Sequence, residues 1–386
     1  MSVPLNGDVL KAVYNWDKSI NMKTPKRILI ANIFGIGDVV FTLPIVDNLK
    51  NMFEGSRVDY LCNARVNGVL ELVSGIDNIH IYEKDKYLNL WKNSKRLFVK
   101  EVLNLFFSIK KKKYDIVFDF TLSREFGFVF LLCGIKRRIG FDYKNRGIFL
   151  TDKMALTGFD GKHVVEFYLE LLKYAGIDAR VFCPAITPDE YSLKWAKNYL
   201  LNKNVEKDRL IFIIPGGGAS WGKDAVRKRW PDENFAIVAD ALINEKFQIC
   251  ILGAHSERVL CETVANKMKF KPSFIENDLD IKKYIALLSL GALVITNDGG
   301  PLHLASALGR KVVAIFGPVD ENVYGPYPKD KNCNRVLTVD GLQCRPCYKN
   351  FRLSACKLNM LCLYGVHPND IIKECGELLA DKLSHV

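Results

Sequence analysis

The chain has 386 residues, of which 49% are hydrophobic and 25% are charged, as in a globular protein long enough for two domains. Lys and Arg (55) exceed Asp and Glu (43) by 12, which favours an anionic partner: nucleic acid, acidic lipid or a phosphorylated substrate. Nucleic acid is disfavoured, because no zinc-finger, homeodomain or RNA-recognition signature is present and no base-stacking aromatics interleave the basic residues. A membrane span is excluded, because the longest apolar run, 126–135, is about half the required length. No secretory signal is visible, so the 11 cysteines indicate reduced thiols and a cytoplasmic protein.

Short apolar strands alternate with helical patterns in two sets, which are separated by a polar segment at 183–208. Such alternation indicates crossover units and parallel sheets. The sequence therefore predicts an α/β fold with two Rossmann-like, doubly wound domains facing a central cleft, and ligands at the carboxyl ends of the strands. The expected strands are 27–33, 57–63, 79–83, 114–120 and 137–141, then 209–215, 247–253, 273–277, 292–297 and 311–317.

The first strand-to-helix loop, NIFGIGDVVF at 32–41, resembles a dinucleotide fingerprint but fails it, because Val40 stands where the third glycine belongs. Gly35 and Gly37 still allow a ligand to approach the backbone closely. Asp38 falls at the start of a helix, where a carboxylate caps orphan amides. The same position keeps it ionised and able to act as a general base, and the two interpretations are compatible.

Three loops of the second half suit a nucleotide. The glycine-rich loop at 213–231 carries basic residues that suit a phosphate, although a solvated basic loop is the alternative and the P-loop spacing is absent. At 294–309 a glycine turn precedes a helix whose first amides suit an anion and whose first turn contains His303, which is either a diphosphate ligand or structural. Glu257 either contacts a ribose or, as we favour from the local sequence, is a first-turn glutamate.

Taken together, these segments resemble the ADP-heptose:lipopolysaccharide heptosyltransferases, glycosyltransferase family 9. They occur in the family's order and cover most of residues 25–330. The matching stretches are 33–50, 137–151, 163–177, 215–242, 251–258 and 294–326.

The resemblance implies a GT-B fold. Residues 1–190 would form the acceptor-binding domain, residues 205–365 the nucleotide-sugar-binding domain, and residues 366–386 a C-terminal helix that packs back on the first domain. It also implies an inverting, metal-independent enzyme that needs no cofactor. This enzyme would transfer heptose from ADP-heptose to the lipopolysaccharide inner core while bound peripherally to the inner face of the inner membrane.

The resemblance also implies roles for individual residues, with Asp38 as the catalytic base. The loop before Trp230 looks longer than in many members, which leaves open whether Ser220, Lys223 or Lys228 reaches the phosphates; Lys228 is the first choice. The expected donor-binding residues are Ser220, Lys228, Glu257, Asp298, Gly299, Gly300 and His303. The expected acceptor-binding residues are Gly35, Gly37, Arg124, Arg138 and Arg146, the arginines because their fork geometry suits phosphates and carboxylates.

Two further features leave alternatives open. No metal is expected, but the C-x2-C-x8-C-x5-C spacing of Cys344, Cys347, Cys356 and Cys362 is a weak zinc candidate beside a disulfide or free thiols. The helical pattern at 94–113 ends in four lysines. The favoured interpretation is a core-packed helix with a solvated end, and the alternative is a helix that docks to anionic lipid. The alternative functions are a GT-B transferase or epimerase that uses another nucleotide sugar, and a non-catalytic nucleotide-binding protein.

Overall fold

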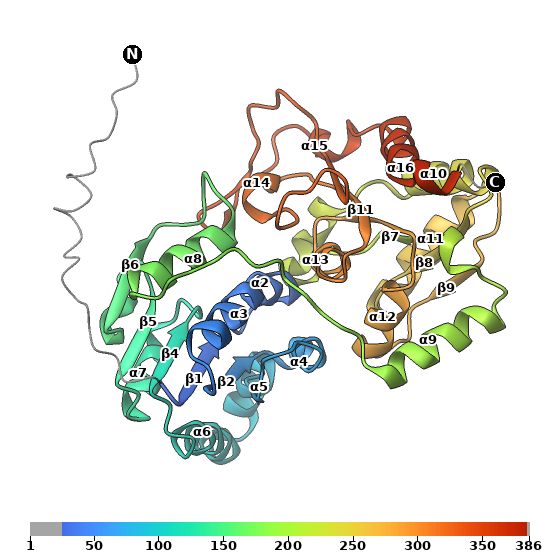
Figure 1. Cartoon of the computed structure of the whole chain (residues 1–386). Coiled ribbons are helices and arrows are strands. Elements are labelled where there is room, and N and C mark those ends of the chain that lie inside the picture. Colours follow the sequence, from blue (N-terminus) through green and yellow to red (C-terminus); the bar gives the residue numbers. More distant parts are fainter. Residues whose placement is uncertain (1–24, 384–386) are drawn as a thin grey trace.

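The computed structural model describes residues 25–383, except for the side chains of residues 219–220 and 381–383. It contains two six-stranded sheets with helices on their faces, one in each half of the chain (Figure 1). The first sheet consists of β1 (Arg27–Ala31), β2 (Arg57–Cys62), β3 (Asn78–Ile81), β4 (Ile116–Asp119), β5 (Arg137–Tyr143) and β6 (Asp152–Leu156). The second consists of β7 (Leu210–Ile214), β8 (Gln248–Leu252), β9 (Phe274–Glu276), β10 (Leu293–Asn297), β11 (Lys311–Ile315) and β12 (Asn334–Leu337).

The two sheets have the same topology. The strand order is β3-β2-β1-β4-β5-β6 in the first and β9-β8-β7-β10-β11-β12 in the second, and all neighbouring strands in both sheets are parallel. This is the order of the doubly wound dinucleotide-binding fold, whose switch point lies between the first and fourth strands. In this chain those switch points are β1/β4 and β7/β10, so ligand sites are expected after β1 and after β7 and β10.

Helices connect the strands. In the first half these are α2 (Ile36–Val40), α3 (Leu43–Met52), α4 (Asn67–Leu70), α5 (Lys84–Asn93), α6 (Lys95–Lys110), α7 (Arg124–Leu132) and α8 (Val164–Tyr174). In the second half they are α9 (Glu190–Asn202), α10 (Asp232–Asn244), α11 (Arg258–Lys267), α12 (Ile281–Leu288), α13 (Gly300–Ala307), α14 (Glu321–Tyr324), α15 (Leu361–Tyr364) and α16 (Pro368–Leu383). A short hairpin is formed by β13 (Tyr348–Lys349) and β14 (Arg352–Leu353). Within the described residues, no helix is both long enough and apolar enough to cross a bilayer.

The ten expected strands are all present, but the sixth strand of each sheet was not expected. β6 and β12 lie at sheet edges and have few buried residues. An edge strand packs against one neighbour only, so its sequence needs no continuous apolar run and gives a weak signal. The expectation that the two sets of strands make two Rossmann-like domains is confirmed.

The C-terminal helix α16 corrects one expectation. It packs on α10 and on β11 and β12 of the second domain, not back on the first domain. Its buried residues Ile371, Cys375, Leu378 and Leu379 belong to the apolar core formed with α10 and with one face of the second sheet. Lys311 Nζ, at the start of β11, also donates to the Leu378 carbonyl at 2.6 Å. Because the apolar side of the helix is covered there, it completes the second domain.

Candidate active site between the domains

Asp38 lies in the loop after β1, at the third position of the short helix α2. Its Oδ2 accepts a hydrogen bond from the Gly35 N–H at 3.2 Å, and the Asn32 side chain donates to the Asp38 carbonyl at 3.1 Å. The carboxylate is half-buried, and burial raises the pKa of Asp38 while the Gly35 amide and Lys228 act to lower it. A carboxylate whose pKa is raised is a better proton acceptor than an exposed one. In the structure, Asp38 can thus accept the Gly35 amide at the helix start and still have a carboxylate oxygen available to accept a proton.

The glycine loop after β7 is shaped by Glu257 from the neighbouring strand-to-helix loop. Glu257 Oε1 accepts from the Gly217 N–H at 2.8 Å, and Oε2 accepts from the Ala254 N–H at 3.0 Å. A Cβ at Gly216 would lie 2.3 Å from the Glu257 carboxyl carbon, and Gly217 has a φ of 114°, so both positions require glycine. Glu257 therefore holds the glycine loop in shape. The prediction from the local sequence, that Glu257 is a first-turn helix residue, did not include this role.

Lys228 and Asp298 form the main charged pair of the second domain's site. Lys228 Nζ lies 2.7 Å from Asp298 Oδ2, and the two side chains are only 11% and 5% exposed. The ammonium also lies 4.3 Å from the centre of the Trp221 ring, within the range of a cation–π contact. Asp298 Oδ2 makes no hydrogen bond within the part of the chain that the structure describes, so the ion pair compensates for its burial. Lys228 is thereby held at the carboxyl edge of the second sheet.

The start of α13 brings the two domains together. Gly299 and Gly300 follow Asp298 and lead into α13, whose first-turn amides have no partner inside the helix. A Cβ at Gly300 would lie 3.2 Å from Ile36 Cβ, and a Cβ at Gly37 would lie 2.6 Å from His303 Cδ2. The helix that carries Asp38 therefore meets the helix expected to hold the diphosphate.

His303 is buried at this interface. Its ring lies 4.6 Å from that of Phe41 in an edge contact. Burial lowers the pKa of His303 to about 3, with smaller contributions from His163 and Lys228. A neutral imidazole can still donate a hydrogen bond to a phosphate oxygen. In this structure the His303 ring packs against Gly37 and Phe41.

The predicted acceptor arginines fall into two groups. Arg124 begins α7 and Arg146 follows β5, so both lie at the carboxyl edge of the first sheet, and both act to lower the pKa of Glu125. Arg138 instead lies near the amino end of β5, at the opposite edge. Its guanidinium donates to the carbonyls of Phe149 and Ile135. We therefore withdraw Arg138 from the acceptor group, because its position and its hydrogen bonds are structural.

Two other expectations concern the second half of the chain. The Ser220 side chain lies outside the described part of the structure, so its predicted contact stays a prediction. All 11 cysteines are free thiols, and among the described residues no three His, Cys, Asp or Glu side chains gather closely enough to hold a metal ion. Cys347 Sγ lies near the Cys344 carbonyl and Cys356 Sγ accepts from the Met360 N–H, so the cysteine segment is arranged by backbone contacts.

Sequence reasoning missed two buried asparagines that order the loops. Asn32 follows β1 and accepts from the Phe34 N–H at 3.1 Å, besides its bond to the Asp38 carbonyl. Asn297 ends β10, donates to the carbonyls of Pro215 and Gly216, and accepts from the Trp230 N–H at 3.0 Å. Both are fully buried at the ends of central strands. The sequence does carry a signal for both asparagines, because each is a polar residue at the end of an apolar strand.

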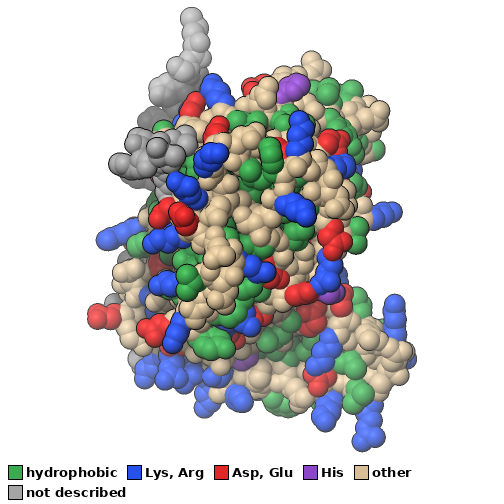
Figure 2. Space-filling model, turned by 90° about the vertical axis from the view of Figure 1, so that its right-hand side faces the viewer, with side chains coloured by type: hydrophobic (Ala, Val, Ile, Leu, Met, Phe, Trp, Pro, Cys, Tyr) green, Lys and Arg blue, Asp and Glu red, His purple; other side chains and the backbone are tan. Residues whose placement is uncertain are grey.

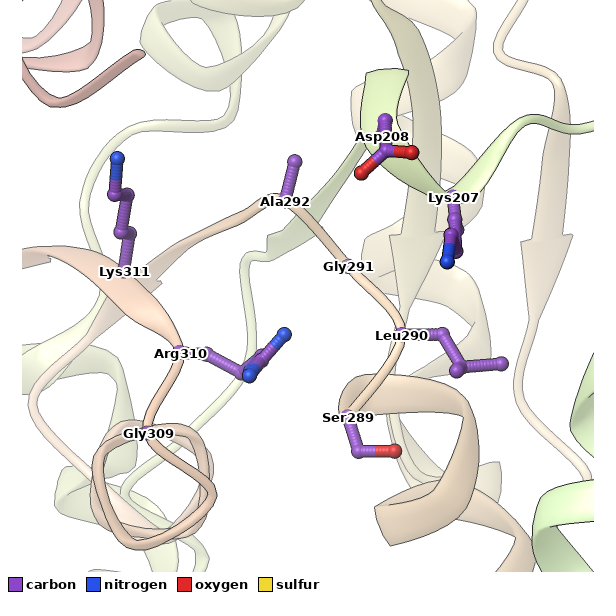
Figure 3. A pocket seen from close by; sticks show the side chains of 9 residues that line it. All are labelled: Lys207, Asp208, Ser289, Leu290, Gly291, Ala292, Gly309, Arg310 and Lys311. Atoms are coloured by element: carbon purple, nitrogen blue, oxygen red, sulfur yellow. The ribbon is translucent and has the colours of Figure 1, made fainter. Parts of the chain in front are cut away.

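A cavity in the second domain lies away from these residues. It has a volume of about 340 Å³ and is lined by residues such as Lys207, Arg310 and Lys311 (Figure 3). These residues precede or begin β7 and β11, so the cavity lies at the amino edge of the second sheet. It is therefore at the opposite edge of the sheet from Lys228 and the start of α13.

The geometry defines the class of protein. Two Rossmann-like domains meet at the carboxyl edges of their sheets, with a half-buried carboxylate on one side and a cationic, glycine-lined loop on the other. This arrangement is typical of a two-domain enzyme whose ligands bind between the carboxyl edges of its sheets. Residues 102–354 match the model of glycosyltransferase family 9 (heptosyltransferase), so the chain belongs to this family and is a glycosyltransferase.

Relatives and solved structures agree with this assignment. The chain is 24% identical over 323 residues to the lipopolysaccharide core heptosyltransferase OpsX of Haemophilus influenzae, covering 82% of this chain and 85% of that protein. Its fold matches that of a family 9 glycosyltransferase from Veillonella parvula with a TM-score of 0.76 at 21% identity, covering 92% and 98% of the two chains. It also matches Escherichia coli heptosyltransferase WaaC with ADP, with a TM-score of 0.64 at 18% identity, covering 80% and 92%. The expected GT-B fold is thus confirmed.

Proposed function

We propose that this enzyme transfers heptose from ADP-heptose to a sugar of the lipopolysaccharide inner core, with inversion at the anomeric carbon. The observation that carries the proposal is the half-buried Asp38 carboxylate on α2, the short helix that packs against the start of α13 from the second domain. The family, and the ADP named with the similar Escherichia coli structure, support the choice of donor. The first domain would hold the acceptor and the second the donor.

In the proposed reaction, an Asp38 carboxylate oxygen takes the proton from the acceptor hydroxyl. The hydroxyl oxygen forms a bond to the anomeric carbon as the bond from that carbon to the diphosphate oxygen breaks, and ADP leaves with the electron pair. The raised pKa of Asp38 favours the proton transfer. Attack from the face opposite the leaving group gives inversion.

Groups of the second domain would stabilise the leaving ADP. Lys228 is partly buried and is held by Asp298 and Trp221, so its charge is preorganised near the start of α13. The amides of Gly299 and Gly300 would bind phosphate oxygens, and His303 would add a hydrogen bond. We assign charge stabilisation in this way to groups of the chain and not to a metal ion or cofactor.

The remaining site residues complete the proposal. Each Glu257 oxygen accepts one backbone hydrogen bond and keeps the capacity to accept another from a ribose hydroxyl. Asp298 would orient the heptose. On the acceptor side, Gly35 and Gly37 would give clearance for the sugar, and Arg124 and Arg146 would bind its anionic substituents. Because the acceptor is part of a lipid-anchored molecule, we place the enzyme at the cytoplasmic face of the inner membrane.

A donor panel tests this function. The purified protein is incubated with ADP-heptose, and separately with other ADP-sugars, UDP-sugars and GDP-sugars, in the presence of truncated lipopolysaccharide core acceptors. Mass spectrometry of the acceptor and measurement of the released nucleotide identify any transfer. We expect a mass gain of one heptose with ADP-heptose alone. Turnover with a UDP- or GDP-sugar but not with ADP-heptose would overturn the donor assignment, and ADP binding without turnover of any donor would favour a non-catalytic role.

A further inference from the structure

Helix α6 carries an apolar stripe that points away from the protein core. Val99, Leu103 and Phe107 follow one another at intervals of four residues, so they share one face of the helix. Their exposed fractions are 51%, 45% and 56%. The opposite face is the one that packs inward, through Leu105, Phe106 and Ile109. The sequence reading of this helix as core-packed therefore accounts for one face only.

Neighbouring helices extend the exposed apolar surface. Leu88 and Trp91 of α5 are 48% and 51% exposed, and the Trp91 ring packs against Phe98 of α6 at 5.1 Å. Helix α7 lies beside α6, since Cys133 Sγ, just after α7, donates to the Phe106 carbonyl at 3.8 Å. Figure 1 shows α5 and α6 side by side on the outside of the first domain. We refer to Leu88, Trp91, Val99, Leu103 and Phe107, on α5 and α6, as the docking face.

The docking face lies in the most basic part of the chain. Residues 84–113 contain ten Lys and Arg residues and two acidic residues, Asp85 and Glu101, which gives a surplus of 8 out of 12 for the whole chain. Glu101 is paired with Lys86 at 2.7 Å, so it neutralises a cation of the same hairpin. Arg96 and Lys100 are exposed and, at 100° per residue, fall on the same side of α6 as the apolar stripe, and the exposed Lys111 follows directly after the helix.

We propose that this docking face binds the surface of an anionic lipid bilayer. Lysines at such a surface are attracted by the negative headgroups, while a row of apolar side chains and a tryptophan insert at the headgroup level. A protein partner would need an acidic surface with a matching apolar ridge, whereas an anionic bilayer offers both properties to any face that is basic and apolar. The combination of cations and apolar groups on one face therefore favours lipid.

The position of the docking face suits the proposed function. The lipid binding itself does not depend on that function, but the role that we give to the binding rests on it. Helix α5 begins three residues after the end of β3, at the carboxyl edge where Asp38 and Arg124 also lie. Helix α6 runs back to the amino edge before β4, so docking at α5 and α6 would lay this flank of the acceptor-side domain on the lipid surface. The side of the molecule in Figure 2, turned by 90° from Figure 1, carries interspersed Lys, Arg, Asp and Glu side chains. A surface of mixed sign gives no comparable attraction to anionic lipid.

Vesicle co-sedimentation tests the inference without any substrate. The full-length protein is mixed with vesicles of phosphatidylcholine alone or of phosphatidylcholine with phosphatidylglycerol, at low and high salt. We expect binding to the anionic vesicles that weakens at high salt. Two variants probe the face independently: Leu103→Ser with Phe107→Ser, and Lys100→Glu with Lys111→Glu. The lysine variant should weaken binding at least about tenfold, because each Lys near such a surface contributes a factor of roughly five. The apolar variant should weaken binding to a similar extent, because it removes two side chains that would insert at the headgroup level.

Matched controls lie on the second half of the chain. Ile237→Ser with Val259→Ser replaces equally exposed apolar residues of α10 and α11, and Lys194→Glu with Lys197→Glu reverses two exposed lysines of α9. These controls should bind vesicles like the unaltered protein. All variants should keep the unfolding midpoint of the unaltered protein and its rate of transfer to a detergent-dispersed acceptor.

Equal vesicle binding by the docking-face variants and the control variants would overturn the inference. A docking-face variant that changes only self-association in sedimentation equilibrium would overturn it as well. Vesicle binding without any sugar transfer would contradict the proposed function and leave this inference standing.

Discussion

Asn297 orders two loops of the candidate site in the second domain. Its amide joins the glycine loop after β7 to the start of α10, because it contacts the carbonyls of Pro215 and Gly216 and the N–H of Trp230. Trp230 is in turn held by its indole N–H, which donates to the Val366 carbonyl at 3.1 Å. All of this is buried, so no water replaces a lost partner at low cost.

We expect Asn297→Ala to lower the free energy of unfolding by about 2–4 kcal/mol, since it leaves buried backbone groups without partners. The affinity for ADP should fall as well, because the glycine loop loses its anchor. Urea unfolding and titration calorimetry measure the two effects. Asn198→Ala, at an exposed position of α9, is the control and should change neither. A stability and an ADP affinity equal to those of the unaltered protein would show that the loop is held by other contacts.

The predicted site residues differ in how well the sequence placed them. Asp38, Lys228, Asp298 and Gly300 were predicted from strand-to-helix loops, and the structure brings these loops together because the carboxyl ends of both sheets face one another. Arg138 was misplaced, although the expected strand 137–141 already put it at an amino end. Glu257 was found, but its hydrogen bonds to the glycine loop depend on two adjacent loops and could not be predicted from one of them.

At the scale of elements, the strands with continuous apolar runs were predictable and the edge strands were not. β1, β4, β7 and β10 are central and fully or almost fully buried, so their sequences are apolar except at the strand ends. β6 and β12 are each paired on one side only, and their half-buried residues include charged and amide side chains. The partner of a helix is also hidden from the sequence: the apolar side of α16 could cover either domain, and only the structure shows that it covers α10.

At the scale of the whole molecule, aromatic and histidine side chains join the two domains beside the candidate site. His163 begins α8 of the first domain, and its Nε2 donates to the Gly325 carbonyl of the second at 3.0 Å. Its Nδ1 accepts from the Val165 N–H, so the ring is neutral with a defined tautomer. The ring stacks on Tyr327 and meets Phe41 edge-on, and Phe41 also meets His303.

This arrangement predicts a pH dependence of stability. Burial lowers the pKa of His163 to about 4, below the value of about 6.5 in an unfolded chain. Between these values the unfolded state binds more protons, so the stabilisation is complete above about pH 6.5 and is lost as the pH falls toward 4. The loss amounts to at most about 1.4 kcal/mol per pH unit for this histidine.

His163→Gln isolates the effect, since glutamine offers a donor to Gly325 but does not titrate. Urea unfolding is measured between pH 7.5 and 4.5 for both proteins. The variant should have a shallower fall in unfolding free energy with decreasing pH, while contributions from Asp38 and other groups remain common to both. Parallel curves for the two proteins would contradict the assignment of a buried, neutral His163.

The central claim, that Asp38 is the base of a transfer between the domains, is tested most directly by Asp38→Asn. The variant keeps an oxygen for the Gly35 N–H but cannot take a proton. Transfer from ADP-heptose is measured together with ADP affinity, with Asp47→Asn on α3 as a second half-buried aspartate for control. We predict that Asp38→Asn slows transfer by a factor of about 100 to 10,000 with unchanged ADP affinity, and that Asp47→Asn does not. Near-normal turnover by Asp38→Asn would contradict the account.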